Sequence, residues 1–180
     1  MKGLVERWYR MLASGKLVLA LLVLYIFSQM SIGLLLHRLG SGALRLQTTF
    51  CRDVFVEILQ SWGAQGAAVY MRHFYLDFFH PVIYSLLLAS CIAFFTASQE
   101  RGPGRFYLAL FVLPFFAGLC DLVENILHVG MIRGWLPITD AMVFTSGTFT
   151  NTKWAAAGVC IVAVIVLGLK KAVSGLKRKG

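Results

Sequence analysis

The chain has 180 residues, of which 58% are hydrophobic and only 14% are charged. Soluble domains contain about 45–50% apolar and about 25% charged residues, so this composition excludes an ordinary soluble enzyme. With this much apolar side chain to bury, it also excludes intrinsic disorder. The net charge is +9, but in so apolar a chain basic residues are more typical of the flanks of membrane spans than of a nucleic-acid surface. We therefore expect one integral membrane domain over residues 1–180, with the lipid bilayer and no nucleic acid as its partner.

Four windows are apolar and long enough to cross a bilayer as helices, which takes about 20 residues. These windows are residues 16–36, 73–97, 106–130 and 150–169. A short connection joins the second and third spans, so we expect these two helices to be antiparallel neighbours. The sequence thus predicts an all-α fold in the form of a polytopic membrane four-helix bundle.

Basic residues gather at both ends of the chain and predict its orientation. Residues 1–16 hold four basic residues and one acid, and residues 170–180 hold five basic residues and no acid. Positive charge accumulates on the cytoplasmic side of membrane proteins. We therefore expect a multi-pass protein of the cell (inner) membrane with both termini in the cytoplasm, and a short cytoplasmic turn at residues 98–105.

The connection between the first and second spans contains an amphipathic stretch at residues 49–62, which Thr49 is positioned to cap. Such a stretch predicts an interfacial helix, either packed on the ends of the spans or covering the mouth of the bundle as a lid. Its apolar face contains Phe50, Val54, Phe55, Ile58, Leu59 and Trp62.

Polar residues interrupt the second span at helical spacing. His73, Asp77, His80 and Tyr84 are separated by four, three and four residues, which places them along one side of a helix. Pro81 lies among them, and a helical proline deprives the carbonyl four residues earlier of its hydrogen-bond donor. That carbonyl belongs to Asp77. The sequence therefore predicts a kink and a free carbonyl beside this carboxylate.

The third span carries a second polar face, formed by Asp121, Glu124, Asn125 and His128 at positions i, i+3, i+4 and i+7. A charged side chain at the centre of a bilayer costs about 2.5–3.5 kcal/mol. Two carboxylates on one span are therefore expected to point into the bundle or to share partners.

The other two spans are polar at a similar depth. The first offers Tyr25, Ser28 and Gln29 on one face, and the outer turns of the fourth contain Lys153. Counted from the outer ends near His73 and Gly130 at about 1.5 Å per residue, His80 and Asp121 lie about 10–14 Å deep. We expect them to line one polar cavity that opens outward.

Such a cavity suits a lipid-like or amphiphilic small molecule, on which the protein would act by acid–base chemistry or which it would simply bind. The expected catalytic groups are Asp77, His80, Asp121 and Glu124. The expected substrate-binding residues are Tyr84, Asn125, Lys153, Gln29 and His128. A competing interpretation is purely structural, with the carboxylates paired to Lys153 for assembly alone.

The spacings DxxH in the second span and DxxExxxH in the third also resemble the carboxylate–histidine pairs of metal sites in helical bundles. The ligands of such a metal would be Asp77, His80, Asp121, Glu124 and His128. The paired Glu-x-x-His motifs of di-iron bundles do not occur in the sequence, so no cofactor is assigned.

Two further hypotheses remain open. The same carboxylates would serve a proton- or ion-coupled carrier or receptor, which at four spans would be expected to form a homo-oligomer. Alternatively, the chain is an accessory subunit of a larger membrane complex that buries the polar face against a partner.

The chain resembles a group of uncharacterised prokaryotic four-span integral membrane proteins in the segments LQTTFCRDVFVEILQSWGAQGAAVYMRHFYLDFFHPVIY, LPFFAGLCDLVENILH and TNTKW. The matching residues are Asp77, Pro81, Tyr84, Pro114, Asp121, Glu124, Asn125 and Lys153. The resemblance implies a four-span fold and carries no activity with it. In architecture alone, the chain is similar to the sterol-isomerase and sigma-2-receptor four-helix membrane family, in which buried carboxylates surround a lipid-like ligand.

Overall fold

The computed structural model describes residues 2–96 and 104–177. These residues form seven α-helices and one short 3-10 helix, η1 (His37–Leu39), and no β-strand occurs among them. The predicted all-α fold class is confirmed. The predicted turn at residues 98–105 lies, apart from its last two residues, outside the described ranges.

Three helices are long and apolar enough to cross a membrane: α2 (Gly15–Leu36), which η1 extends to Leu39, α6 (Arg105–Ile132) and α7 (Asp140–Lys177). The first two agree with the predicted spans 16–36 and 106–130. Helix α7 begins well before the predicted span 150–169, because the polar but helix-compatible residues after Asp140 continue the helix outward. Apolar side chains are exposed along all three helices; on α2, for example, Phe27 is 70% and Leu34 is 72% exposed. Faces of this kind suit contact with lipid.

The fourth candidate span is a bent pair of helices, α4 (Arg52–Asp77) and α5 (His80–Thr96), whose axes differ by 43°. The predicted kinked span over residues 73–97 thus falls on two helices, which Phe78 and Phe79 separate. The interruption stands immediately before Pro81, which has no N–H and fits the first turn of a new helix. The predicted kink at this proline is therefore confirmed as a complete break between helices.

The amphipathic stretch predicted at residues 49–62 largely coincides with the first half of α4, but the helix begins at Arg52 and its N-cap is Cys51 rather than the predicted Thr49. This half ends at Gly63, whose backbone (φ 57°, ψ −168°) lies in a region that favours glycine. After the kink the chain returns at once to helical geometry and continues to Asp77. The small residues after Gly63 are therefore helical.

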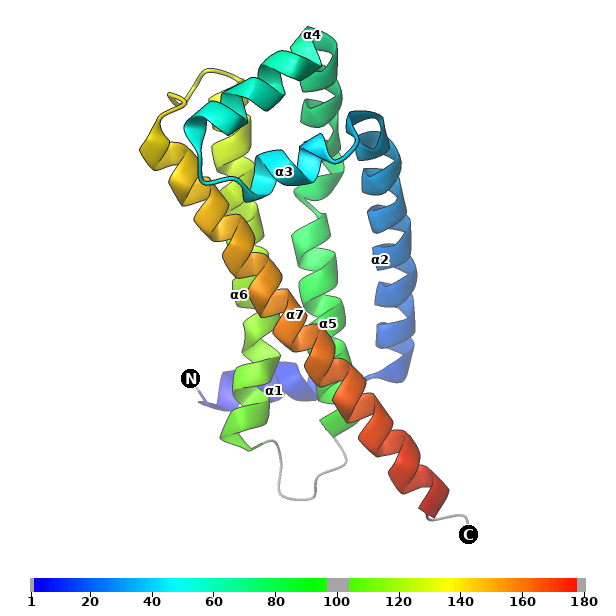
Figure 1. The fold of residues 1–180 in the computed structure, drawn as a ribbon. Helices are drawn as coiled ribbons and strands as arrows, with labels where there is room; N and C mark the ends of the chain where they lie inside the picture. The colour runs from blue at the N-terminus through cyan, green and yellow to red at the C-terminus, as the bar shows by residue number, and fades with distance from the viewer. Residues whose placement is uncertain (1, 97–103, 178–180) are drawn as a thin grey trace.

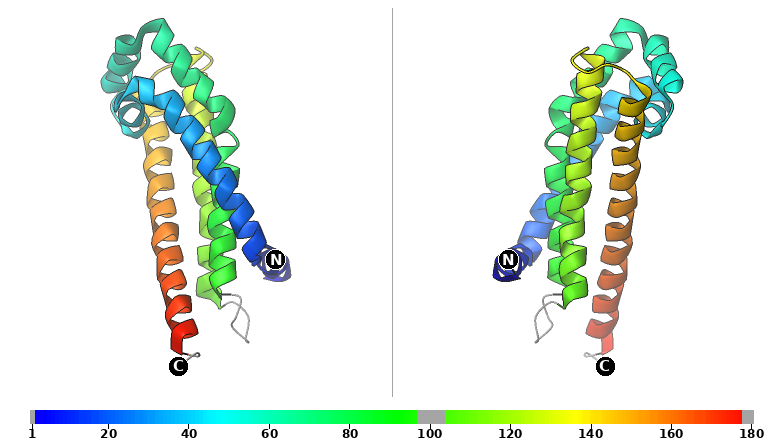
Figure 2. Two further views of the ribbon diagram at one scale, coloured as in Figure 1. Left: turned by 90° about the vertical axis from the view of Figure 1, so that its right-hand side faces the viewer. Right: turned by 90° about the vertical axis from the view of Figure 1, so that its left-hand side faces the viewer.

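Two helices were not predicted. Helix α1 (Lys2–Leu12) lies across one end of the molecule, and both chain ends are found at that end (Figure 1). Helix α3 (Gly42–Thr48) lies at the opposite end, next to the first half of α4 (Figure 1). Side views show α5, α6 and α7 running along the molecule, with these short helices gathered at its ends (Figure 2).

Packing divides the described interior into three apolar clusters, of which the smallest contains Tyr84, Ala117 and Ala156. Helix α6 packs mainly on α5 and α7, whereas α2 packs on α4 and α5. The cluster at the end with α3 contains Leu46, Phe55, Ile58, Tyr70, Phe74, Met131 and Val143. The cluster at the end with the termini contains Tyr9, Leu12, Ala89, Ile92, Ala93, Phe111 and Leu167. In the sequence, most polar residues of the second and third spans lie between the residues that α4, α5 and α6 contribute to these two end clusters.

Helices α5 and α6 approach closely at Gly118. A Cβ atom there would lie 2.3 Å from Ser85 Oγ and 3.1 Å from the carbonyl oxygen of Pro81. Ser85 also donates a hydrogen bond to the carbonyl of Pro114, at 2.8 Å. Glycine is therefore required at this contact, and the close approach fixes the height at which polar residues of the two helices meet.

Candidate functional site

The strongest electrostatic contact in the interior is an ion triad between α6 and α7. The Nζ atom of Lys153 lies 2.6 Å from Asp121 Oδ1 and 2.6 Å from Glu124 Oε2. All three side chains are buried. The contact with Asp121 has hydrogen-bond geometry, whereas neither oxygen of Glu124 makes a hydrogen bond, so Lys153 meets Glu124 as an ion pair only. Two carboxylates share one ammonium, which leaves the triad with one negative charge when all three groups are ionised.

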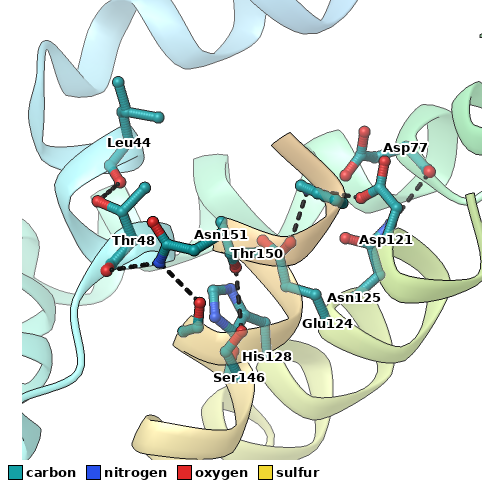
Figure 3. Close-up of polar contacts among 12 residues, drawn as sticks. Leu44, Thr48, Asp77, Asp121, Glu124, Asn125, His128, Ser146, Thr150 and Asn151 are labelled. Atoms are coloured by element: carbon teal, nitrogen blue, oxygen red, sulfur yellow. Dashed lines mark hydrogen bonds and ion pairs between the residues drawn. The ribbon is translucent and has the colours of Figure 1, made fainter. Parts of the chain in front are cut away.

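Asp121 and Glu124 reach the same ammonium because they are three residues apart on one side of α6. Figure 3 shows these two residues, followed by Asn125 and His128, in order along that helix. The triad is the pairing that the structural interpretation of the sequence expected. It uses two of the three buried carboxylates and leaves the third, Asp77, outside.

Asp77 is the last residue of α4 and is only 7% exposed. The nearest basic group is His73, whose Nε2 lies 3.6 Å from Asp77 Oδ2. That separation exceeds a hydrogen bond. No side chain in the described ranges donates a hydrogen bond to this carboxylate, and it faces a cavity. Asp77 is therefore the carboxylate available to a ligand.

The backbone carbonyl of Asp77 has a partner that the sequence did not reveal. Because Pro81 has no N–H, this carbonyl is free, and Asn125 Nδ2 donates a hydrogen bond to it at 3.1 Å (Figure 3). Asn125 is fully buried. The amide thus links α6 to the break between α4 and α5 and holds Asp77 in place.

Replacing Asn125 with leucine is expected to lower the free energy of unfolding by about 1–3 kcal/mol, since a buried carbonyl loses its donor. Pro81→Ala supplies a backbone N–H that can replace the amide, so the double variant should recover part of the loss. Thermal unfolding of the two single variants and the double variant in detergent measures this coupling. Strictly additive effects would contradict the proposed link.

His80, the first residue of α5, is held by α2. Its Nδ1 lies 2.9 Å from Ser28 Oγ. The ring of Tyr25 stacks on the imidazole with a centroid distance of 5.4 Å and an interplanar angle of 28°. Ser28 and Tyr25 therefore fix the orientation of this ring and leave its Nε2 as the nitrogen that can meet a ligand.

A cavity of about 600 Å³ adjoins Asp77 and His80. Helices α2, α3, α4, α5, α6 and α7 all contribute to its wall. The charged and polar part of the wall contains Gln29, Gln47, His73, Asp77, His80, Tyr84, Asp121 and Lys153. The apolar part includes Ile32, Leu36, Ala43, Leu44, Leu87, Leu88, Ala157 and Ile161, and the aromatic side chains of Tyr25 and Trp154 complete it. The cavity is thus polar at one side and apolar over most of the remainder.

Six of the nine predicted site residues line this cavity: Asp77, His80, Asp121, Tyr84, Lys153 and Gln29. Three do not. Glu124 lies behind Lys153, Asn125 binds the backbone, and His128 accepts or donates a hydrogen bond with the Tyr70 hydroxyl through Nδ1 at 2.8 Å. These three side chains are buried against neighbouring helices and do not line the cavity; the predicted catalytic role of Glu124 and the predicted substrate-binding roles of Asn125 and His128 stay predictions.

The structure also adds cavity residues that the sequence did not single out as a site. His73, which is fully buried, adjoins Asp77 and lines the wall; its place in the polar stripe of the second span was the available signal. Leu44 and Gln47 come from α3, a helix too short to leave a periodic pattern. Trp154 follows Lys153 and is half exposed.

The residues predicted as possible metal ligands do not form a metal site in the described part of the chain. Within residues 2–96 and 104–177, no group of three or more His, Cys, Asp or Glu side chains is arranged to hold a metal ion. The reason is visible in the triad, where the ammonium of Lys153 occupies the position between Asp121 and Glu124 that a cation would take. His128 is directed to Tyr70 instead.

The chain matches no protein-family model, no curated protein and no solved structure. The structure itself defines the class of protein. It is an all-α protein with three helices able to cross a membrane, or four spans if α4 and α5 form one, and with a cavity whose wall is polar on one side.

Proposed function

We propose that this is a four-span membrane protein that binds a lipid-like, amphiphilic small molecule, with the head group at Asp77 and the apolar part along α2 and α7. The observation that carries the proposal is the cavity itself. Its volume, about 600 Å³, lies within the range of about 300–1,000 Å³ typical of small-molecule sites. A buried carboxylate, Asp77, stands at one side of it with His73 Nε2 at 3.6 Å as its ion-pair partner, and apolar side chains line the other side.

The proposed arrangement in the membrane uses α4 and α5 as one bent span beside α2, α6 and α7. Both chain ends lie at the same end of the molecule (Figure 1), as an even number of spans requires. Basic residues gather at this end, so we place it in the cytoplasm of a cell with the protein in the inner membrane. The cavity then belongs to the outer half of the bilayer, with α3 and the first half of α4 at the outer interface.

Access from the bilayer is favoured by the way the helices pack. Helices α2 and α7 both contribute to the cavity wall, but they pack little on each other. Helix α2 packs on α4 and α5, whereas α7 packs mainly on α6. At the other end, the apolar cluster around Tyr9, Ile92 and Phe111 fills the interior. This closure supports a binding site open on one side over a carrier pathway through the bundle.

The charges of the site favour a particular kind of head group. Lys153 is already neutralised by two carboxylates, and Asp77 adds a further negative charge at the cavity wall. A phosphate or carboxylate head group would meet this charge unfavourably, whereas an amine or hydroxyl could donate to Asp77. The aromatic rings of Tyr25, Tyr84 and Trp154 in the wall also suit an ammonium group.

Acid–base chemistry on the bound molecule would depend on Asp77 and His80, since these are the groups free to exchange a proton with it. Asp121 is held by Lys153, and Glu124 has no access to the cavity.

Photolabelling tests the proposal directly. A long-chain amine with a diazirine in its alkyl chain is expected to label Trp154 or Ala157, and excess unlabelled amine should compete for that labelling. Phe106 and Leu119 of α6, which are exposed and do not line the cavity, serve as lipid-facing controls whose labelling should not be competed. Ala157→Phe fills part of the cavity and should reduce only the competed fraction. Uncompeted labelling everywhere would reject the cavity as a binding site.

A further inference from the structure

Helix α1 presents three different faces. Val5, Tyr9 and Leu12 pack on the protein, with Tyr9 only 2% and Leu12 only 7% exposed. At 100° per residue, a second face carries Leu4, Trp8 and Met11, and a third carries Arg7 and Arg10. A helix that only covers the end of a bundle needs one apolar face, so the second apolar face calls for an explanation.

The orientation of α1 on the bundle is fixed by Tyr9. Its hydroxyl hydrogen-bonds to Thr96, whose own hydroxyl donates to the carbonyl of Ile92. Tyr9 is therefore the donor, and burial raises the pKa of Tyr9, which keeps the phenol protonated. The Tyr9 ring also meets Phe111 edge-on, with centroids 5.3 Å apart. These contacts hold α1 against the ends of α5 and α6.

The second apolar face is left uncovered. Leu4 is 63%, Trp8 49% and Met11 57% exposed, and no described side chain buries them. Helix α1 leads within two residues, Ala13 and Ser14, into α2, so it lies where a span begins. Tryptophan is enriched at this level of membrane proteins.

The basic side chains adjoin this apolar face on the side away from the protein. Arg7, Arg10 and Lys16 are exposed, and Lys170 and Lys171 are exposed on α7; both chain ends lie at this end of the molecule (Figure 1). Glu6 is the one acidic residue of α1. Basic side chains beside inserted apolar ones are the pattern with which interfacial helices bind anionic lipid.

We infer that α1 lies in the membrane interface, with Leu4, Trp8 and Met11 among the acyl chains, and binds anionic phospholipid head groups through Arg7, Arg10 and Lys16. This site is separate from the cavity, and it does not depend on what the cavity binds. It makes one end of the protein selective for an anionic leaflet.

The test uses the full chain in vesicles containing equal amounts of phosphatidylglycerol and phosphatidylcholine. After mild detergent release, native mass spectrometry is expected to find phosphatidylglycerol enriched on the wild type. Arg7→Gln/Arg10→Gln should reduce this enrichment about tenfold or more. Arg38→Gln/Arg45→Gln removes the same charge from exposed residues near η1 and α3 and should leave the enrichment unchanged.

Tryptophan fluorescence provides a second test, because it reports whether α1 is inserted among the acyl chains. In the same vesicles, Leu4→Ser/Met11→Ser is expected to shift tryptophan emission to longer wavelength, because Trp8 loses its neighbours in the acyl region. Equal unfolding temperatures of the variants would show that the fold is intact. Unchanged lipid enrichment in the double arginine variant, or unchanged emission in the double serine variant, would overturn the inference.

Discussion

Replacing Lys153 with methionine is expected to lower the free energy of unfolding by about 3–5 kcal/mol. The ammonium is the shared partner of Asp121 and Glu124, at 2.6 Å from each. Its removal leaves two carboxylates buried side by side without a counter-charge. We expect a collapse of folded yield in detergent and, where protein is recovered, a large fall in the unfolding temperature.

The matched controls remove charged groups of the triad in such a way that no remaining buried charge lacks a counter-charge. Asp121→Asn alone leaves Lys153 paired with Glu124 and should change stability little. The triple variant Lys153→Met/Asp121→Asn/Glu124→Gln removes the whole triad and should recover most of the stability lost in Lys153→Met, because no buried charge remains. A Lys153→Met protein as stable as wild type would show that the triad does not stabilise the fold.

Asp77→Asn is expected to act in the opposite way, with folding retained and binding lost. The carboxylate accepts no hydrogen bond from a described side chain, so its neutralisation removes only the 3.6 Å contact with His73 and relieves repulsion from the nearby acids. Loss of a charge-assisted contact with an amine head group should weaken binding about 10- to 100-fold. Unfolding temperature and displacement of the diazirine amine, measured on the same preparation, separate the two effects.

Glu124→Gln is the matched control for this experiment. It removes one carboxylate from the same region, but Glu124 does not line the cavity. We expect a clearly smaller loss of affinity than in Asp77→Asn. Equal losses in the two variants would mean that binding depends on the net charge of the region rather than on the Asp77 carboxylate.

The structural interpretation of the polar residues explains only part of the cluster. It accounts for Asp121, Glu124 and Lys153, which neutralise one another between α6 and α7. It does not account for Asp77, which is buried at a cavity wall without a hydrogen-bonding partner. Burial of a carboxylate whose nearest partner is His73 at 3.6 Å, without a hydrogen bond, is costly, and a ligand would offset that cost.

Much of the fold could be predicted from the sequence, because span length and apolar composition are local properties. The consequence of Pro81 was predictable for the same reason, since the missing N–H concerns only the residue four positions earlier. The partner of the freed carbonyl was not, because Asn125 is distant in sequence and reaches it only once α5 and α6 pack at Gly118. The sequence pattern thus identified the acceptor, the Asp77 carbonyl, whereas only the packing of the helices identified its donor, Asn125.

Periodicity was least informative about the third span. Residues at i, i+3, i+4 and i+7 share a face, but that face is broad enough to touch several neighbours. Asp121 at one edge meets the cavity, whereas His128, nearly two turns later, meets Tyr70. The unpredicted helices α1 and α3 are short, and their helical state depends on contacts with the bundle rather than on a long repeat.

The most direct measurement of the central claim is a crystal structure of the full chain grown from a lipidic phase with a long-chain amine. The account predicts continuous density in the cavity, with the amine within hydrogen-bond distance of Asp77 and the chain between α2 and α7. A cavity filled only by ordered water, or closed by side chains from α2 and α7 while the amine lies elsewhere, would contradict it.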